Sequence, residues 1–253
     1  MEWQDEGIVV ARRRHGESAA VVTLLTRAHG RHVGLVRGGA GRRAGGLYQA
    51  GTLVTARWRA RLAEHLGSFV CEMSEAIAAR MLDDPARLEA LAAICAVLQA
   101  ALPEREPHPA LFASTLDLLR GLDAPGWPAR YVRWETRLLA ELGFGLDLTR
   151  CAATGSREDL TYVSPRTGRA VGAAAGEPYG GRLLRLPRFL VSERDDADVD
   201  SGEIVAGLAL TGHFLDRSVF APHGRQLPAA RTRLVERLGR SATISSTNRT
   251  RTR

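Results

Sequence analysis

The chain of 253 residues contains no lysine, so its 35 cationic side chains, histidine apart, are all arginine. Cysteine is also scarce: only Cys71, Cys95 and Cys151 are present, far apart and odd in number. That count argues against the disulfide framework of a secreted protein. No apolar run approaches the roughly 20 residues that cross a bilayer. The start, MEWQDEGIVV, is acidic where a signal peptide is basic. We therefore expect a globular protein of the cytoplasm.

The lack of lysine bears directly on the glycine-rich stretch RGGAGRRAGG, residues 37–46. A P-loop needs a lysine that reaches the β and γ phosphates, so this stretch is not a P-loop. Gly39, Gly41 and Ala44 match a dinucleotide-binding pattern, but that pattern must open a helix. The residues that follow, LYQAGTLVTARWRAR, predict a strand instead. We predict a mobile basic hairpin loop that either contacts phosphates or is merely solvated.

The arginines gather at the two ends of the sequence. Residues 1–61 hold 11 arginines against 4 acidic residues, and residues 217–253 hold 9 against 1. The segment between them holds 15 against 23, and the whole chain has a net charge of +7. An arginine-rich genome explains the preference for arginine but not this separation. The separation predicts a surface for polyanions at the basic ends.

Aromatic residues make up only 6% of the chain, and the first 80 residues are rich in β-branched residues instead. Runs of these residues, separated by turn pairs such as His15-Gly16, predict five strands. The strands are expected at GIVVAR, SAAVVTLLT, RHVGLVRG, TLVTARWRARL and Gly67–Met73. Five short strands over this length predict a small barrel of the OB type.

The fourth strand has the clearest two-residue period. Its apolar positions are Val54, Ala56, Trp58, Ala60 and Leu62, and between them lie Thr55, Arg57, Arg59 and Arg61. Successive side chains of a strand point to opposite faces, so one face is predicted to be apolar and the other a row of guanidinium groups. We expect the basic loop to lie next to this row.

From Asp83 the period becomes helical. Asp84 and Pro85 are typical of an N-cap and a first helical turn, and apolar residues then recur every three or four positions. Further helices are expected at about 109–121, 128–142, 202–219 and 228–239. The predicted fold class is therefore multidomain β + α. An OB-fold domain is expected at 1–80, an all-α domain at 81–240 and a disordered basic tail at 241–253.

No catalytic motif is recognisable, which disfavours a hydrolase and predicts that the protein is not an enzyme. The run ERDDADVDSGE, residues 193–203, alternates acidic residues as a metal loop does. Counted from Asp196, however, Ser201 and Gly207 stand where an EF-hand needs glycine and glutamate. We predict a solvated linker in which Asp200 or Ser201 caps the next helix.

The insert at about 150–176 has the turn-rich look of a small zinc ribbon but a single cysteine. Ribbon spacing would put the four ligands at Cys151, Thr154, Gly172 and Ala175, three of which do not bind zinc. We therefore predict a degenerate ribbon without metal, in which Cys151 is a small buried residue or a free thiol.

Several segments together resemble the RecO family of bacterial recombination mediators. The start WQDEGIVVARRRHGESAAVVTLLTRAHGRHVGLVRGGAGRR has the family's GES turn, TR-x-HG hairpin and basic loop. Later segments that are similar are ETRLLAELGFGLDLTRC, LTYVSPRTGRAV and LTGHFLDRSVFAPHGRQLPAARTRLVERL. The resemblance covers nearly the whole chain. It implies an OB-fold domain followed by a helical domain with a zinc-ribbon-like insert.

The resemblance also implies a function in DNA repair and recombination. Members bind single- and double-stranded DNA, anneal complementary strands and assist recombinase loading on DNA coated with single-strand-binding protein (SSB). The implied partners are DNA, RecR and the acidic C-terminal tail of SSB. No membrane partner or cofactor is expected, and the implied location is the cytoplasm, at the nucleoid. From the residues alone, an RNA-binding OB module in RNA processing or translation is the alternative, because the charge pattern fits either nucleic acid.

Two sets of residues are the predicted sites. The expected contacts to DNA phosphates are Arg14, Arg31, Arg37, Arg42, Arg43, Arg57, Arg59 and Arg61. The expected site for the SSB tail is a helix stripe made of Arg130, Tyr131, Arg133 and Arg137. Guanidinium groups at this spacing share a helix face and hold carboxylates bidentately. The alternative for the stripe is a helix whose aromatic residues enter the core and whose arginines pair with acidic neighbours.

Overall fold

The computed structural model describes residues 1–192 and 195–251, and the side chains of Arg43 and of residues 244–251 lie outside what it describes. The chain forms two compact units. The first contains Met1–Asp123 with Pro228–Arg231, and the second contains Ala124–Leu227 with the chain from Thr232 onward. The sequence places a boundary near residue 80. In the structure the first unit extends to Asp123, because two helices pack on the barrel.

The first unit begins with five strands that form a closed barrel. The strands are β1 (Glu2–His15), β2 (Ala19–Thr26), β3 (Gly30–Val36), β4 (Leu53–Arg59) and β5 (Ser68–Glu75). Their order around the barrel is β1-β2-β3-β5-β4, with β1 paired to both β2 and β4. The parallel pair Leu35 and Ser68 joins β3 to β5. All five predicted strands are confirmed, and the arrangement fits the OB fold.

Alternation along the strands fills the barrel. Side chains from every strand meet inside: Val9, Ala20, Val22, Leu24, Val36, Val54, Ala56, Trp58, Phe69 and Cys71. A register shift between Val9 and Ala11 bends β1, which allows one long strand to pair with neighbours on both sides. The predicted alternation of the fourth strand is confirmed as far as Arg59. Arg61 and Leu62 follow the end of β4 and are both exposed.

The basic loop contains a short helix, α1 (Arg42–Leu47), where the sequence predicted a hairpin loop leading directly into a strand. That prediction was wrong because the strand signal begins only at Leu53, which leaves room for one helical turn. Backbone conformation and close packing require glycine at two positions of the loop. Gly38 has a φ of 70°, and a Cβ on Gly39 would lie 2.9 Å from the Cβ of Ala20. The loop is therefore packed against the barrel.

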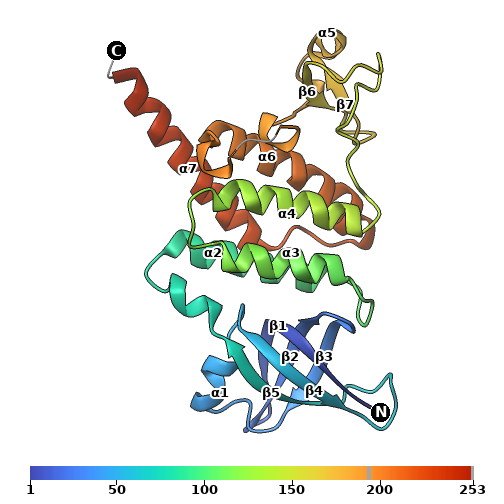
Figure 1. The fold of residues 1–253 in the computed structure, drawn as a ribbon, viewed down its shortest axis with the longest axis vertical. Coiled ribbons are helices and arrows are strands. Elements are labelled where there is room, and N and C mark those ends of the chain that lie inside the picture. The colour runs from blue at the N-terminus through green and yellow to red at the C-terminus, as the bar shows by residue number, and fades with distance from the viewer. Residues whose placement is uncertain (193–194, 252–253) are drawn as a thin grey trace. The chain divides into compact units, whose positions relative to one another are not determined.

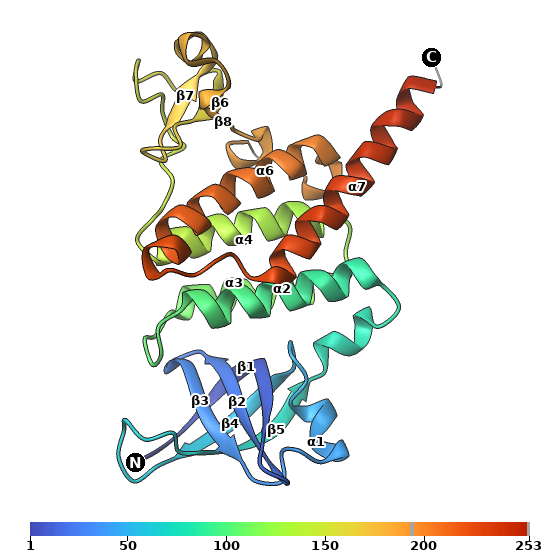
Figure 2. The same cartoon turned by 180° about the vertical axis from the view of Figure 1, so that it is seen from behind.

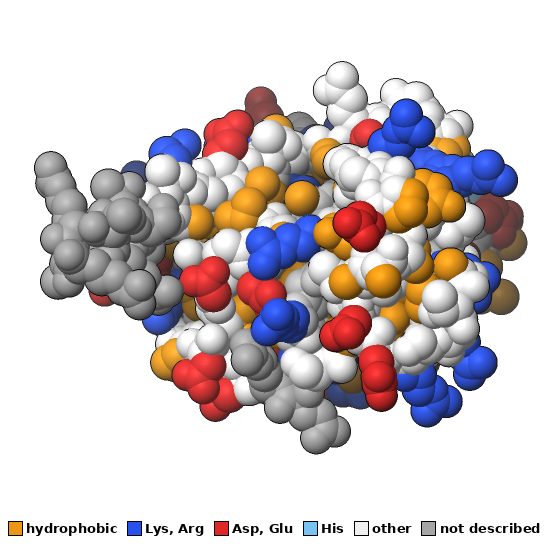
Figure 3. Space-filling model, turned by 90° about the horizontal axis from the view of Figure 1, so that it is seen from above, with side chains coloured by type: hydrophobic (Ala, Val, Ile, Leu, Met, Phe, Trp, Pro, Cys, Tyr) orange, Lys and Arg blue, Asp and Glu red, His pale blue; other side chains and the backbone are white. Residues whose placement is uncertain are grey.

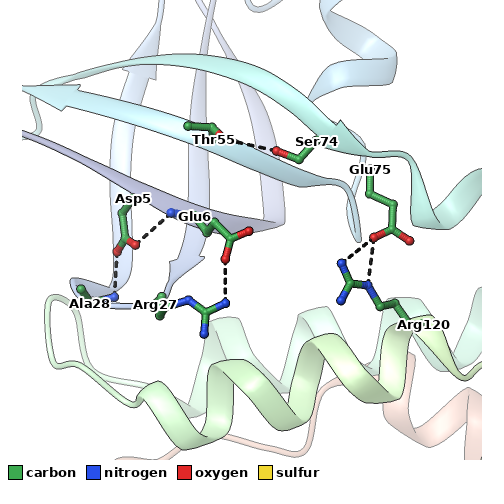
Figure 4. Close-up of polar contacts among 8 residues, drawn as sticks. All are labelled: Asp5, Glu6, Arg27, Ala28, Thr55, Ser74, Glu75 and Arg120. Carbon is green, nitrogen blue, oxygen red and sulfur yellow. Dashed lines mark hydrogen bonds and ion pairs between the residues drawn. The ribbon is translucent and has the colours of Figure 1, made fainter.

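Two helices of the first unit lie beside the barrel, α2 (Pro85–Ala101) and α3 (Pro109–Arg120) (Figures 1 and 2). They follow the 3₁₀ turn η1 (Ile77–Met81). The Asp84 side chain accepts hydrogen bonds from the backbone of Ala86 and Arg87, which confirms the predicted N-cap. In Figure 4, Arg120 of α3 binds Glu75 of β5, with an Nη2–Oε2 distance of 2.8 Å. This ion pair ties α3 to the barrel.

The second unit is mainly helical. Its helices are α4 (Trp127–Glu141), α5 (Ala173–Gly176), α6 (Ser201–Phe214) and α7 (Ala229–Arg251), the last of which begins in the first unit. Shorter turns are η2 (Glu177–Arg182), η3 (Arg188–Leu190), η4 (Asp196–Asp198), η5 (Leu215–Phe220) and η6 (Ala221–His223). Asp200 caps α6 through the amide of Gly202, as predicted. Buried Glu135 of α4 accepts a hydrogen bond of 2.5 Å from Thr211 of α6.

The chain from residue 241 to Arg251 continues as helix α7, so the predicted disordered tail is not found there. Residues 252 and 253 lie outside the described residues. The tail lacks an apolar period, but no proline or glycine follows Gly239 to end the helix. The Thr243 hydroxyl also bonds to the carbonyl of Gly239, one turn back.

One stretch of the described chain, Ser201–His223, is long and apolar enough to cross a bilayer by length and composition alone. Glu203, Asp216 and Arg217 are the charged residues of this stretch, apart from histidine. Within its most apolar 18-residue window 56% is buried inside the protein, and Leu208, Leu210 and Phe214 are buried residues of the stretch. That burial is typical of a core helix in a soluble protein.

Candidate nucleic-acid interface

The predicted row of guanidinium groups is present on β4. Arg57 and Arg59 are exposed, whereas Trp58 between them is buried in the barrel. Arg61 follows in the β4–β5 loop and is exposed as well. We call these three arginines the strand cluster. Its positive charge is partly offset by Glu2, whose carboxylate lies 3.9 Å from Nε of Arg57.

A second group of exposed arginines, the loop cluster, consists of Arg14, Arg37 and Arg42. Arg14 pairs with Ala20, and Ala20 pairs with Val36, so the end of β1 and the end of β3 lie beside the start of β2. The basic loop follows β3 directly. Arg43 belongs to the same loop, but its side chain lies outside the described residues.

Arg12 holds this loop on the barrel, although no sequence pattern predicted this role. Its Nε donates to the carbonyl of Gly39 at 2.9 Å, and its Nη1 lies within 3.7 Å of where a Cβ on Gly45 would be. The only hint in the sequence was that Arg12 precedes Arg14 by two positions on the same strand. Arg12 therefore positions the loop cluster by binding the backbone of the loop.

Closure of the barrel brings the start of the basic loop near the strand cluster. Leu35, two residues before Arg37, pairs with Ser68 of β5, and Ser68 also pairs with Arg59. Neighbouring strands lie about 4.8 Å apart, so the backbones of Leu35 and Arg59 are roughly 10 Å apart. Arg14 lies further round the barrel, because it pairs with Ala20 of β2, which in turn pairs with Val36 of β3. The basic loop therefore begins one strand away from the row of arginines, as expected from the sequence.

Arg31 is not available for phosphate contact. Its Nε donates to the carbonyl of Leu102 at 2.8 Å, and its Nη1 lies 3.3 Å from Glu104. The side chain is only 15% exposed. Arg31 instead joins β3 to the loop between α2 and α3, so its assignment to the phosphate contacts is corrected.

The predicted peptide stripe on α4 is not an open surface. Tyr131 is 0% exposed and Trp134 is 2% exposed, so the aromatic residues belong to the core. Nε of Arg133 lies 2.9 Å from Asp196 of η4, and Nε of Arg130 lies 3.8 Å from the same carboxylate. Only Arg137 of the predicted set is exposed. The assignment of Tyr131 to a peptide site was wrong, because the amphipathic face of α4 points it inward.

The insert forms a three-stranded sheet in the order β7-β6-β8. Its strands are β6 (Leu160–Val163), β7 (Ala170–Gly172) and β8 (Leu184–Arg185). Cys151 lies against this sheet with 1% exposure, and its sulfur accepts a hydrogen bond of 3.3 Å from the amide of Gly172. A hydrogen bond from Thr154 and that amide bond lower the pKa of Cys151 to about 7. Three of the four predicted ligand positions thus meet around one sulfur.

Charged side chains of both signs are mixed on the face drawn in Figure 3, and the described surface there forms no continuous patch of one sign. Among the described residues, no group of three or more His, Cys, Asp or Glu side chains lies close enough to hold a metal ion. The candidate interface is therefore built from the exposed arginines of the barrel.

A basic OB-type barrel followed by helices is an architecture of nucleic-acid-binding proteins. Comparison with protein families identifies the family to which this architecture belongs. Residues 1–75 match the family model described as Recombination protein O N terminal. Residues 82–227 match the model described as Recombination protein O C terminal. The chain belongs to the RecO family of DNA repair and recombination proteins.

Similar curated proteins extend over nearly the full chain. DNA repair protein RecO of Rhodospirillum centenum is 55% identical over 247 residues, covering 97% of this chain and 98% of the relative. DNA repair protein RecO of Cereibacter sphaeroides (strain ATCC 17023) is 51% identical over 243 residues, covering 95% and 100%. DNA repair protein RecO of Phenylobacterium zucineum is 50% identical over 245 residues, covering 96% and 100%.

Proposed function

We propose that the protein is a recombination mediator that binds single- and double-stranded DNA and anneals complementary strands. In this proposal it also assists recombinase loading on SSB-coated DNA, together with RecR and the SSB tail. The observation that carries the proposal is the match to both RecO family models, over residues 1–75 and 82–227. The two exposed arginine clusters of the barrel supply the physical means.

The balance between charge and aromatic residues favours binding that does not depend on base sequence. Six exposed arginines belong to the two clusters, whereas Tyr48, Trp58 and Phe69 are buried. Guanidinium groups that contact phosphates bind any sequence, and base readout requires side chains that reach base edges. A protein that anneals arbitrary complementary strands needs this kind of contact.

The proposed activity requires no covalent step, and we therefore propose a binding protein and not an enzyme. Annealing brings two strands together through neutralised phosphates, and base pairing does the rest. The insert around Cys151 fits a zinc ribbon that functions without metal, because hydrogen bonds from Thr154 and Gly172 engage the remaining sulfur. We propose the cytoplasm, at the nucleoid, as the place of action.

A strand-annealing assay on SSB-coated oligonucleotides tests the proposal. We expect the wild-type protein to accelerate annealing and the triple variant Arg14→Ala, Arg37→Ala, Arg42→Ala to be slower by at least about tenfold, because three phosphate contacts are lost. The matched control removes three exposed arginines of the second unit that lie outside the basic ends, Arg157, Arg166 and Arg182, and should keep the wild-type rate.

The same preparation separates the alternative function. Affinity for a single-stranded DNA is compared with affinity for an RNA of the same base sequence. A clear preference for RNA, with no acceleration of DNA annealing, would replace the proposal with an RNA-binding role. Equally weak binding to DNA and RNA, with annealing at the protein-free rate, would contradict both proposed functions.

A further inference from the structure

A cavity of about 570 Å³ opens at the end of the barrel where β1 begins. That volume lies within the range of small-ligand pockets. The residues that matter for its chemistry are Trp3, His29, His32, Trp58 and Arg105. All of them belong to the first unit. The strand cluster lies next to this cavity. Arg57 and Arg59 flank Trp58 in the sequence, and Arg59 pairs with Glu2 at the cavity rim.

The walls of the cavity are aromatic. Trp3 stacks on His29 with ring centroids 4.1 Å apart and planes 6° from parallel. Trp3 also lies nearly parallel to Trp58, at 5.7 Å and 20°. His32 meets both indoles edge-on, with centroid distances of 5.0 Å to Trp3 and 4.8 Å to Trp58. Trp58 and His32 are buried within this cluster, and the partly exposed rings of Trp3 and His29 present the aromatic surface on which a nucleobase can stack.

His32 supplies polar atoms inside these walls. The side chain comes from β3, points into the barrel and is only 4% exposed. Among the residues that the structure describes, neither Nδ1 nor Nε2 makes a hydrogen bond of normal geometry, although the backbone of His29 lies near the ring. Leaving a buried polar group unpaired is unfavourable, so a polar ring held here without a partner points to a ligand that provides one.

The imidazole is neutral at neutral pH. Burial lowers the pKa of His32 to about 4, and the nearby charge of Arg105 acts in the same direction. A neutral imidazole presents one donor and one acceptor. The edge of a nucleobase presents complementary donors and acceptors, whereas an aliphatic or phenyl side chain presents none.

Arg105 fixes the rim of the cavity. Its guanidinium donates to the carbonyls of Ala63, Glu64 and His65, at 2.5, 3.2 and 2.8 Å, and so holds the β4–β5 loop in place. Nε of Arg105 is buried and has no partner among the described residues. The loop between strands 4 and 5 is one of the loops with which OB folds bind oligonucleotides.

We propose that this cavity receives one unpaired base of a bound single strand, stacked against the partly exposed rings of Trp3 and His29 and hydrogen-bonded to His32, while the strand cluster holds its phosphates. The proposal rests on the DNA-binding function proposed above. It adds a base-capturing subsite that a double helix does not fill, because paired bases keep their edges inside the duplex.

The test compares His32→Phe with the wild-type protein. The substitution keeps an aromatic ring and removes both nitrogens. We expect affinity for a mixed-sequence single strand to fall roughly 5- to 20-fold, in the range of one base contact. Affinity for an abasic oligonucleotide and for a blunt duplex should stay at the wild-type value. His223→Phe, an exposed histidine of the second unit, is the matched control and should change none of the three.

A second variant and a direct probe keep the result decisive if His32→Phe folds poorly. Trp3→Leu removes the stacking surface and should give the same selective loss. A single strand that carries a photoreactive halogenated uracil should crosslink to Trp3 or His29 of the wild-type protein, as mapped by mass spectrometry.

The outcomes separate this inference from the proposed function. If the wild-type protein binds and anneals DNA, but neither variant changes single-strand affinity and no crosslink maps to the cavity, the base subsite is wrong and the mediator function stands. If the variants lose affinity for an acidic peptide with an apolar end and not for DNA, the cavity is a peptide site. If the wild-type protein binds no nucleic acid, the proposed function itself fails.

Discussion

At the scale of single residues, His32 shows how a buried ionisable group can make the free energy of unfolding depend on pH. Its pKa is lowered from 6.5 to about 4 in the folded protein, first by burial. Between these two values the unfolded chain binds a proton that the folded chain does not, so acid favours unfolding. The stability lost by pH 4 on this account is about 3 kcal/mol, since one pKa unit corresponds to about 1.4 kcal/mol.

This predicts a difference between wild type and His32→Phe in urea unfolding at pH 7, 6, 5 and 4. The wild-type free energy of unfolding should fall more steeply as the pH drops below 6.5, and the two curves should become parallel again below about 4. Carboxylates titrate equally in both proteins, so the difference isolates the imidazole. Parallel curves throughout would mean that the pKa of His32 is the same in the folded and the unfolded protein.

At the scale of elements, local sequence predicted most of the fold. The five strands, the Asp84 cap of α2 and the Asp200 cap of α6 follow from side-chain alternation and from capping residues, which act over a few positions. Helix α1 was missed because its sequence, RRAGGL, has two glycines and no apolar period. What holds it is the packing of the loop on the barrel, which local propensity does not report.

Gly39 is the position where that packing is tightest, which gives a test at the level of the element. A Cβ there would lie 2.9 Å from Ala20 and 3.0 Å from Val36. Gly39→Val should therefore lower the free energy of unfolding by about 1–3 kcal/mol, the usual cost of overpacking. Gly46→Ala in α1 meets nothing within 4 Å and should be neutral or stabilising. Urea denaturation measures both, and an unchanged Gly39→Val would mean that the loop is free of the barrel.

At the scale of the whole molecule, the sequence predicted where arginines gather on the barrel but not which of them bind other parts of the same chain. The sequence predicted an arginine face and a basic loop, and both are present on the barrel. Arg31 was misassigned because a charged residue on a strand can equally bind its own protein, as it does at Leu102 and Glu104. Tyr131 was misassigned because it shares the apolar face of α4 with Trp134, and that face enters the core, as the alternative interpretation of this helix predicts.

The last prediction concerns both clusters together. Leu35 and Arg59 pair with the same residue of β5, Ser68, so one DNA strand that crosses β5 can contact both clusters. Removing the loop cluster (Arg14, Arg37, Arg42→Ala) or the strand cluster (Arg57, Arg59, Arg61→Ala) should each reduce the slope of log K against log salt by about 2 for a long single strand, at about 0.7 per lost contact. The six-residue variant should lose about twice as much, since each phosphate contact contributes to the slope.

A short oligonucleotide provides the internal comparison, because OB folds occupy roughly 4–16 nucleotides. Near the lower limit a strand presents fewer phosphates, so each triple variant should change its salt slope less than it changes the slope of a long strand. Arg31→Ala should leave both slopes unchanged while it lowers thermal stability, because that side chain holds the α2–α3 loop and not phosphate. If Arg31→Ala changes the slope as much as an exposed arginine does, the strand passes over β3, and the path through the two clusters is wrong.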